Sequence, residues 1–358
     1  MGFYAVGRGP LDAARAAVDG PLPAVPSSPP DVGSGPARRP GKDLLGIEGA
    51  RAADLLAVLR RAARLLPVVE GPPPRRLRWL EGYTVVNFFG EPSTRTRSSF
   101  TLAAQRLGAD VLDFVASDHT SVAKGETIVD AARNLDAMAV DAFVVRNREE
   151  RLPHRLAELL RARIVNAGDG CNEHPTQALL DVWTIMEALG RPLEAPQPLA
   201  GTVVVVCGDI DHGRVAHSDI LALRLLGAEV RAAGPVALFS DATAERLGVR
   251  PHRDFDAALD GAHAVVMLRI QRERLRADLE IDDASYHAAW GLSSDRLSRA
   301  GRDCVVLHPG PINRGIELSD TVADGPASRI LRQVTLGVAV RMAVLLDACG
   351  VPTEGVSP

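Results

Sequence analysis

The feature that most constrains the fold is an alternation of short β-rich runs with stretches of helical spacing, repeated in two successive series. The run Thr202–Cys207 is apolar, as is typical of a central parallel strand. Strands that alternate with helices predict parallel sheets covered by helices on both faces. Since 358 residues exceed one ordinary core, we expect an α/β protein with two doubly wound parallel-sheet domains.

The first series contains four strands separated by helices. We expect the strands at Thr84–Phe89, Asp110–Val115, Ala142–Arg146 and Arg163–Val165. We expect the helices at Leu44–Leu66, Thr96–Leu107, Glu126–Met138, Leu152–Arg161 and His174–Leu189. Pro175 suits the first turn of the last of these helices, and Gly190 suits its end.

The second series follows a proline-rich stretch at residues 191–198, which we interpret as the domain boundary. Its strands are expected at Thr202–Cys207, Ala228–Ala232, Ala262–Leu268 and Cys304–Leu307, and a last helix at Ala327–Ala348. The predicted domains are therefore residues 42–190 and 191–326, followed by a C-terminal helical segment at 327–358.

Residues 1–41 differ from the rest because they contain eight prolines among Ala, Gly, Ser and Arg. This composition buries too little apolar surface to offset the entropy of ordering, so we expect a largely disordered extension. Two interpretations stay open: a dispensable tail and a docking segment for a partner.

Composition excludes several classes of protein. A formal net charge of −4 gives no reason to expect nucleic acid or an anionic membrane as a partner. The four cysteines are widely spaced, which argues against a zinc site and a disulfide framework. No apolar run approaches the roughly 20 residues that span a bilayer, and no signal peptide is evident. We therefore expect a cytoplasmic protein.

The most informative segment, Phe88–Phe100, lies where a strand should end and a helix begin. Free backbone N–H groups and the positive end of the helix dipole favour an anion there. Ser93, Thr94 and Thr96 add hydroxyl donors, and Arg95 adds a planar fork that matches phosphate oxygens. This segment predicts a phosphate-binding loop.

The pattern Phe-x-Glu-x-Ser-Thr-Arg-Thr-Arg-x-Ser-Phe resembles the carbamoyl-phosphate loop of the aspartate and ornithine carbamoyltransferases. The resemblance extends over roughly Leu44 to Cys349. It implies a carbamoyl-phosphate domain, an amino-acid domain and a last helix that packs back on the first domain. It also implies that Ser93, Thr94, Arg95 and Thr96 bind carbamoyl phosphate.

The loop Thr120–Thr127 resembles the segment that members of this family lend to the neighbouring subunit. The resemblance implies that Ser121 and Lys124 reach the phosphate across a subunit interface, and that Lys124 also reaches the amino-acid substrate. A site shared in this way implies a homotrimer.

Arg146 is expected at the carboxyl end of a strand, where ligands of open parallel sheets bind. His174 and Gln177 are three residues apart at a helix start and share a face. The sequence His-Pro-Thr-Gln-x-Leu-Leu-Asp matches the family. The match implies that Arg146, His174 and Thr96 polarise the carbamoyl oxygen and that Gln177 contacts the donor.

The second domain indicates the acceptor. Gly208–Ser218 lacks the G-x-G-x-x-G pattern, so a nicotinamide cofactor is not supported. This segment resembles the aspartate-specific loop, in which Arg214 would bind the α-carboxylate. In the segment Leu268–Arg274, by the same resemblance, Arg269 would bind the side-chain carboxylate and Gln271 would support it. Two arginines suit a dicarboxylic amino acid.

The segment His308–Gly315 lacks the cysteine that ornithine-specific enzymes carry in this region. Carbonyl groups near Gly310 and Pro311 would accept hydrogen bonds from the amine and the carbamoyl NH₂. Two residues depart from the family pattern: Asp211 stands where many aspartate-specific relatives have lysine, and Leu336 replaces a polar residue. Asp211 places an acidic group near the expected anion site.

The resemblance therefore implies transfer of a carbamoyl group from carbamoyl phosphate to L-aspartate, a step of pyrimidine (UMP) biosynthesis, without a metal or organic cofactor. Another acceptor such as ornithine, and a non-catalytic scaffold, remain alternatives. Association of the trimer with regulatory chains or a dihydroorotase-like protein also stays open.

Overall fold

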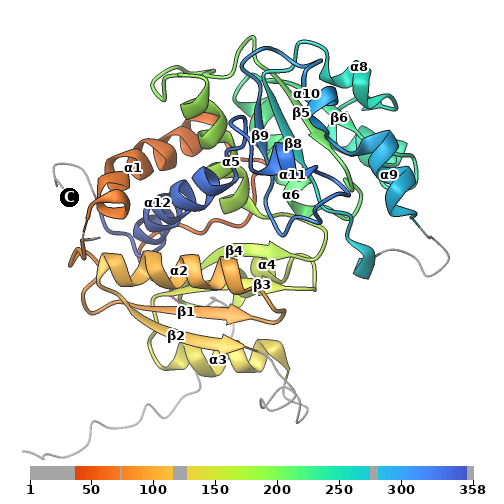
Figure 1. Ribbon diagram of the computed structural model, residues 1–358. Helices are drawn as coiled ribbons and strands as arrows, with labels where there is room; N and C mark the ends of the chain where they lie inside the picture. The colour runs from red at the N-terminus through yellow and green to blue at the C-terminus, as the bar shows by residue number, and fades with distance from the viewer. Residues whose placement is uncertain (1–36, 73–74, 116–126, 275–280, 353–358) are drawn as a thin grey trace, which may run out of the picture. The chain divides into compact units, whose positions relative to one another are not determined.

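The computed structural model describes residues 37–72, 75–115, 127–274 and 281–352. The first half of this part alternates helices with four parallel strands (Figure 1). These elements are α1 (Ala52–Glu70), β1 (Thr84–Phe89), α2 (Thr94–Leu107), β2 (Asp110–Val115), α3 (Ile128–Ala137), β3 (Ala142–Asn147), α4 (Leu152–Leu159), β4 (Arg163–Asp169) and α5 (Pro175–Ala188).

The first sheet has the strand order β2-β1-β3-β4, and every pair is parallel. The chain moves from β1 outward to β2 and then returns to β3, so the winding direction reverses between β1 and β3. Apolar side chains of α1, α2, α5 and α12 (Ile330–Ala348) cover one face, and those of α3 and α4 cover the other (Figure 1).

The second half forms a five-stranded sheet with its own helices. Its elements are β5 (Val203–Cys207), α6 (Arg214–Leu225), β6 (Glu229–Ala233), α7 (Asp241–Leu247), β7 (Pro251–His252), α8 (Phe255–Leu259), β8 (Ala264–Met267), a 3₁₀ turn (Arg272–Arg274), α9 (Asp283–Trp290), α10 (Ser294–Leu297), β9 (Val305–Leu307), α11 (Asp320–Ala323) and α12.

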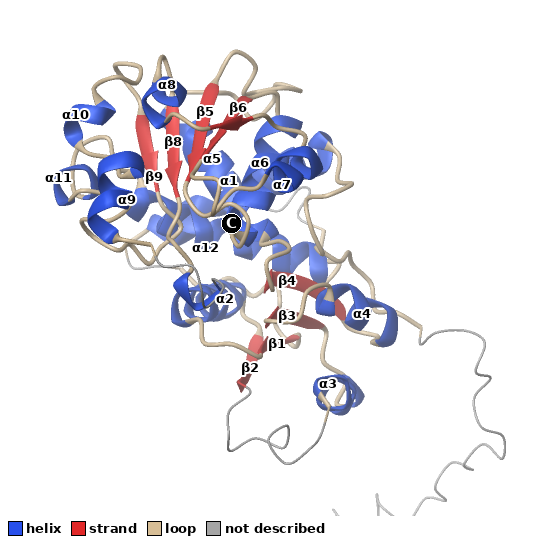
Figure 2. Ribbon diagram, turned by 90° about the vertical axis from the view of Figure 1, so that its right-hand side faces the viewer, coloured by secondary structure: helices blue, strands red, loops and turns tan. Residues whose placement is uncertain are grey.

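The second sheet is also parallel, in the order β7-β6-β5-β8-β9, and its winding reverses between β5 and β8. Helices α6 and α7 pack on one face, whereas α8 and α11 pack on the other (Figure 2). Together with the first sheet, this confirms the predicted α/β fold of two doubly wound parallel sheets.

Helix α12 comes last in the chain but lies among the helices of the first sheet. It contacts α1, α2 and α5, and its side chains from Leu336 to Ala348 are almost all buried. Leu336, which departs from the family pattern, is fully buried there, so an apolar residue suits its surroundings.

The predicted start of the first helix at Leu44 is wrong, because α1 begins at Ala52. The backbone of Leu44 instead bonds to β4: its N–H donates to Ile164 O, and its carbonyl accepts from Asn166 N–H. These long-range backbone bonds outweigh the helical spacing of the side chains. The strands that begin at Thr84 and Asp110 have the predicted bounds.

The described part of the chain gives three further observations. None of its helices is long and apolar enough to cross a membrane. Within the same ranges, no group of three or more His, Cys, Asp or Glu side chains is arranged to hold a metal ion. The four cysteines are free thiols.

Candidate active site

Most of the expected site residues belong to the two points where the sheets reverse their winding. The loop after β1 leads to Thr96, and Arg146 lies near the end of β3. In the second sheet, the loop after β5 leads to Arg214, and the loop after β8 contains Arg269 and Gln271. Open parallel sheets bind ligands in the crevices at such switch points.

The predicted phosphate-binding loop forms the start of α2. Ser93 precedes the first helical residue, its side chain caps no helical N–H, and Thr94 and Arg95 are exposed. Thr96 is 9% exposed. The first N–H groups of the helix lack partners within the helix, so together with these hydroxyls they offer donors to an anion.

Arg146 extends from β3 toward Thr96. One guanidinium nitrogen, Nη1, donates to Ala167 O at 3.1 Å and lies 3.4 Å from Thr96 Oγ1. Arg146 Nε lies 2.8 Å from a carboxylate oxygen of Glu91. Burial and then the charge of Arg214 lower the pKa of Arg146 to about 9. An incoming anion would relieve this unfavourable desolvation and repulsion.

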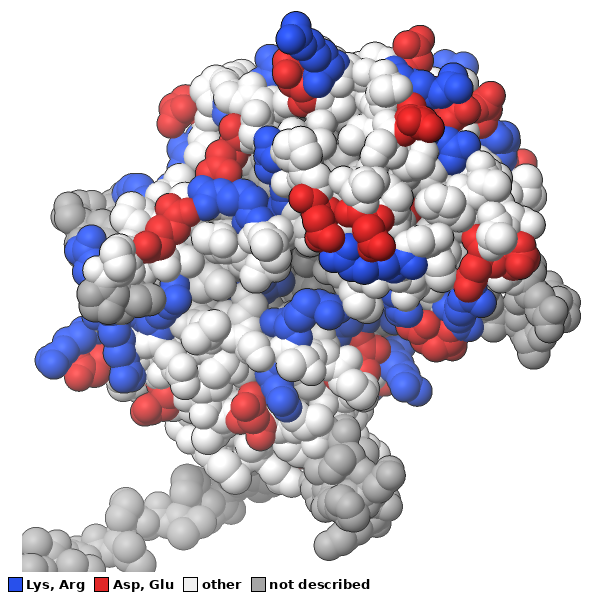
Figure 3. Space-filling view, in the orientation of Figure 1, with Lys and Arg blue, Asp and Glu red and all other residues white. Residues whose placement is uncertain are grey.

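Glu91 connects the two sheets through their arginines. Its carboxylate pairs with Arg146, with Arg214 Nη2 and, at 4.0 Å, with Arg274 Nη2. Glu91 is 8% exposed and Arg214 6% exposed, so these charges are largely out of solvent. One carboxylate facing three guanidinium groups leaves an excess of positive charge. The space-filling view shows a recess in the surface that is bordered by Lys and Arg side chains (Figure 3). The cluster is suited to a polyanionic ligand.

Neither Glu91 nor Arg274 was expected as a site residue. Both belong to the motifs that predicted the site, but the pairing that gives them a role joins positions more than a hundred residues apart. An acidic residue directly before a cationic loop was the available signal, since a buried carboxylate needs a partner.

A glycine allows the arginines to approach the first sheet. Gly168 has φ +118°, and a Cβ added there would lie 3.1 Å from Arg214 Nε and 3.2 Å from Arg146 Nη1. A side chain at this position would crowd both guanidinium groups and would adopt a strained backbone conformation.

His174 lies directly before α5 and is 3% exposed. Its backbone N–H donates to Ser218 Oγ at 2.9 Å, and its Nδ1 has no hydrogen-bond partner among the described residues. Burial, followed by the charge of Arg146, holds the pKa of His174 well below its ordinary value. The imidazole is therefore neutral and can act as a hydrogen-bond partner rather than as a cation.

The residues predicted to bind aspartate already have partners within the protein. Arg269 pairs with Glu273, and Gln271 Nε2 donates to His212 O at 2.8 Å. Arg269 is also near enough to Arg95 for its charge to lower the pKa of Arg95, after the larger effect of burial. Arg95, expected to bind carbamoyl phosphate, therefore lies close to Arg269, expected to bind aspartate.

Gly310 and Pro311 are joined by a cis peptide bond in the loop after β9. A Cβ on Gly310 would lie 3.4 Å from Arg95 Nε, so this backbone lies beside the phosphate-binding loop. The carboxylate of Asp211 accepts hydrogen bonds from the backbone N–H and hydroxyl of Ser240 at 3.0 Å. Its charge is therefore engaged at the start of α7.

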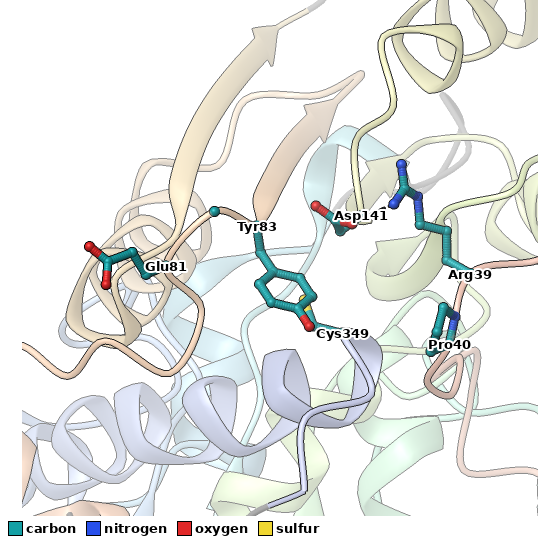
Figure 4. A pocket seen from close by; sticks show the side chains of 7 residues that line it. Arg39, Pro40, Glu81, Tyr83, Asp141 and Cys349 are labelled. Atoms are coloured by element: carbon teal, nitrogen blue, oxygen red, sulfur yellow. Dashed lines mark ion pairs between the residues drawn. The ribbon is translucent and has the colours of Figure 1, made fainter.

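Ser121 and Lys124 lie outside the described residues. A cavity of about 280 Å³ lies elsewhere, beside Tyr83 and Asp141, which directly precede β1 and β3 (Figure 4). Its charged lining includes the ion pair between Arg39 and Asp141, 3.0 Å apart. Because it lies at the amino ends of these strands, it is separate from the candidate site at their carboxyl ends.

Comparison with family models gives two matches in the order of the two sheets. Residues 42–187 match the carbamoyl-phosphate-binding domain of aspartate/ornithine carbamoyltransferases, and residues 200–347 match the Asp/Orn-binding domain. The chain belongs to the aspartate/ornithine carbamoyltransferase family. This confirms the resemblance predicted from the loop motifs.

Curated relatives agree with this assignment. The chain is 51% identical over 312 residues to a protein of Xanthomonas campestris pv. campestris (strain B100) named aspartate carbamoyltransferase catalytic subunit; the match covers 86% of this chain and 96% of the relative. A protein of the same name from Sorangium cellulosum (strain So ce56) is 48% identical; the match covers 86% of this chain and 92% of the relative.

Solved structures support the fold for both branches of the family. Aspartate transcarbamoylase from Trypanosoma cruzi, in complex with carbamoyl aspartate and phosphate, matches with a TM-score of 0.73 and 31% identity, covering 86% of this chain and 96% of that one. Ornithine carbamoyltransferase from Thermus thermophilus has the same TM-score, 26% identity, and coverage of 86% and 98%. The fold therefore does not distinguish the acceptors.

Proposed function

We propose that this chain transfers the carbamoyl group of carbamoyl phosphate to the amino group of L-aspartate, giving N-carbamoyl-L-aspartate and phosphate. The observation that carries the choice of acceptor is the arginine-rich switch point of the second sheet, formed by Arg214, Arg269 and Arg274. A diacid needs such cations, whereas the cationic side chain of ornithine would be repelled. Relatives of about 50% identity carry the aspartate enzyme's name.

In this proposal the donor binds first. The phosphate takes Ser93, Thr94, Arg95 and Thr96 together with the free N–H groups of α2. Binding there places the carbamoyl carbonyl beside Arg146, whose Nη1 lies near Thr96 Oγ1. Preorganised donors of this kind are worth roughly 3 kcal/mol each when charge develops on the carbonyl oxygen.

The acceptor binds between the two sheets' loops. Arg214 takes the α-carboxylate, and Arg269, supported by Gln271, takes the side-chain carboxylate. In the structure these arginines pair with Glu91 and Glu273, so substrate carboxylates would exchange with carboxylates of the protein. Arg214 and Arg269 would therefore each face a carboxylate both before and after aspartate binds.

The neutral amine of aspartate then attacks the carbamoyl carbon. A C–N bond forms, and Thr96, Arg146 and the neutral His174 stabilise the oxyanion. The bond from carbon to the phosphate oxygen breaks, and the leaving phosphate takes the proton from the amine. Carbonyl groups at Gly310 and Pro311 accept hydrogen bonds from the amine and the carbamoyl NH₂, while Gln177 contacts the donor. No protein base, metal or organic cofactor takes part in these steps.

The assembly proposed is a cytoplasmic homotrimer in which Ser121 and Lys124 complete the site of a neighbouring chain. The proposed domains are residues 42–190 for carbamoyl phosphate and 191–326 for aspartate, with 327–358 packing on the first and 1–41 as an extension. The contacts of α12 with α1, α2 and α5 support this division. The reaction product would enter pyrimidine biosynthesis.

An acceptor screen tests the proposed activity. The purified chain is incubated with carbamoyl phosphate labelled in its carbonyl carbon and with aspartate, ornithine or other amino acids separately. We expect labelled N-carbamoyl-aspartate alone. Labelled citrulline would transfer the assignment to ornithine, and binding of carbamoyl phosphate without any product would favour the scaffold alternative.

A further inference from the structure

A pair of buried carboxyl groups lies behind the candidate site. Asp181 on α5 is 1% exposed and Asp219 on α6 is 0% exposed, and their carboxyl groups are close enough that each changes the pKa of the other. Two adjacent carboxylates out of solvent cannot both remain ionised, so one of them must carry a proton. The protonated group can donate its O–H to the other carboxylate.

The surrounding donors decide which carboxyl group carries the proton. Asp181 Oδ1 accepts from Gln177 Nε2 at 3.0 Å and from Gln333 Nε2 at 2.6 Å. Neither oxygen of Asp219 receives a donor from any other described residue. Amide donors stabilise an ionised carboxylate, so the charge belongs on Asp181 and the proton on Asp219.

Charges from the other packed elements agree with this assignment. Arg341, on α12, lies near enough to Asp181 for its charge to favour ionisation of Asp181. Burial raises the pKa of Asp181, and burial together with the charge of Asp181 raises the pKa of Asp219 well above its ordinary value. Of the two carboxyl groups, Asp219 is therefore the one that keeps its proton and Asp181 the one that ionises.

The pair is connected to two parts of the site. Gln177 is a residue proposed to contact the carbamoyl donor. Since an ionised Asp181 only accepts hydrogen bonds, the Gln177 NH₂ group must face it, which leaves the amide oxygen at the other end. Gln333 Oε1 accepts a hydrogen bond from the backbone N–H of His308 at 3.0 Å, and His308 lies two residues before Gly310. Asp181 thus holds both an amide and a loop of the donor site.

We propose that Asp219 is a protonated positioning residue, whose O–H fixes Asp181 so that Gln177 and the Gly310–Pro311 loop are oriented toward the carbamoyl group. The role in donor binding rests on the proposed function; the location of the proton does not. Asp219 itself touches no substrate in this arrangement.

The first experiment locates the proton. Infrared difference spectra between the intact protein and Asp219→Asn, recorded in H₂O and D₂O near pH 7, should show the carbonyl band of a protonated carboxyl group that the variant lacks. The Asn side chain keeps the size and can still donate N–H to Asp181. If the difference spectrum contains only a carboxylate band, the protonated state is refuted.

The second experiment uses the pH dependence of stability. Between about pH 4 and the raised pKa of the folded state, folded Asp219 keeps a proton that the unfolded chain releases. The free energy of unfolding therefore decreases as the pH rises through this range. Asp219→Asn should flatten this part of the curve between about pH 4 and pH 7, while Asp110→Asn, at an exposed position of β2, should keep the original slope. Equal slopes in all three proteins would overturn the proposal.

The third experiment separates positioning from mere packing. Asp219→Leu removes the O–H group that donates to Asp181. It should raise the KM for carbamoyl phosphate about tenfold with little change in the KM for aspartate, because the groups that bind carbamoyl phosphate lose their orientation. The KM of Asp219→Asn for carbamoyl phosphate should stay within about twofold of the original value, because the amide N–H can donate to Asp181. A Leu variant with the original KM, or an Asn variant impaired as strongly as Leu, would refute the positioning role.

These measurements test the role of Asp219 separately from the proposed function. If the intact protein transfers no carbamoyl group to any acceptor, the proposed function fails, but the spectra and the stability curves still decide whether Asp219 is protonated. If transfer to aspartate is observed and Asp219→Leu behaves as the intact protein, only the positioning role fails.

Discussion

Replacing Arg95 by alanine tests the phosphate-binding loop with little risk to the fold. Arg95 is exposed, and within the described ranges it has no ion-pair partner. Partial burial of the guanidinium and the nearby charge of Arg269 already disfavour the charged form of Arg95, as its lowered pKa indicates. Truncation should therefore leave the thermal stability of the unliganded protein unchanged or slightly higher.

Loss of this guanidinium removes a charged fork from a phosphate, which corresponds to about 3 kcal/mol or about a 150-fold decrease in kcat/KM. Ligand-induced stabilisation should fall in parallel. At a phosphate-mimic concentration of about 100 Kd, the intact protein gains about 2.7 kcal/mol, and a variant with a 150-fold larger Kd would gain only about 0.3 kcal/mol. Initial rates and thermal unfolding with and without ligand measure both effects.

Arg133→Ala is a matched control, because it removes the same charge from α3 on the other face of the first sheet. It should keep both the rate and the ligand-induced stabilisation. If Arg95→Ala also keeps normal kinetics and the full thermal shift, the assignment of the phosphate to the start of α2 is refuted.

Four further predictions follow from the site. Glu91→Gln should lower the free energy of unfolding by roughly 3 kcal/mol, since it leaves buried guanidinium groups without a counter-charge; an unchanged urea midpoint would contradict this. Arg269→Ala should raise the KM for aspartate about 100-fold while calorimetry shows unchanged binding of carbamoyl phosphate; equal losses for both substrates would contradict its assignment. Because folded His174 remains neutral while the unfolded imidazole is protonated, stability should fall below about pH 6.5, and His174→Gln should reduce that fall in acid unfolding curves. Mixed trimers of Arg95→Ala and Lys124→Ala chains should recover activity through complete hybrid sites, and confirmed hybrids without activity would refute a shared site.

Local sequence patterns predicted most of the first sheet. The strands at Thr84–Phe89 and Asp110–Val115 have their expected bounds because apolar runs and adjacent turn residues are local signals. The start of α1 was misplaced, since the position of Leu44 depends on backbone bonds to β4, about 120 residues away. Several short helices of the second half were not predicted, because elements such as α10 and α11 have only four residues each and show no periodicity.

The same distinction holds for the candidate site. The residues of the loop after β1 were identified from local chemistry, and their position at a helix start agrees with that reasoning. The pairing of Glu91 with Arg214 and the contact of Asp181 with Asp219 were missed. Both join side chains from different helices or sheets, and no spacing along the chain indicates which partners will meet.

Calorimetric titration of the purified protein with N-(phosphonacetyl)-L-aspartate tests the central claim most directly, because this molecule combines a phosphonate with a diacid. We expect tight binding of one molecule per chain, weakened both by Arg95→Ala and by Arg269→Ala. Absence of binding, or binding that neither substitution weakens, would contradict a single site that holds the carbamoyl donor and aspartate together.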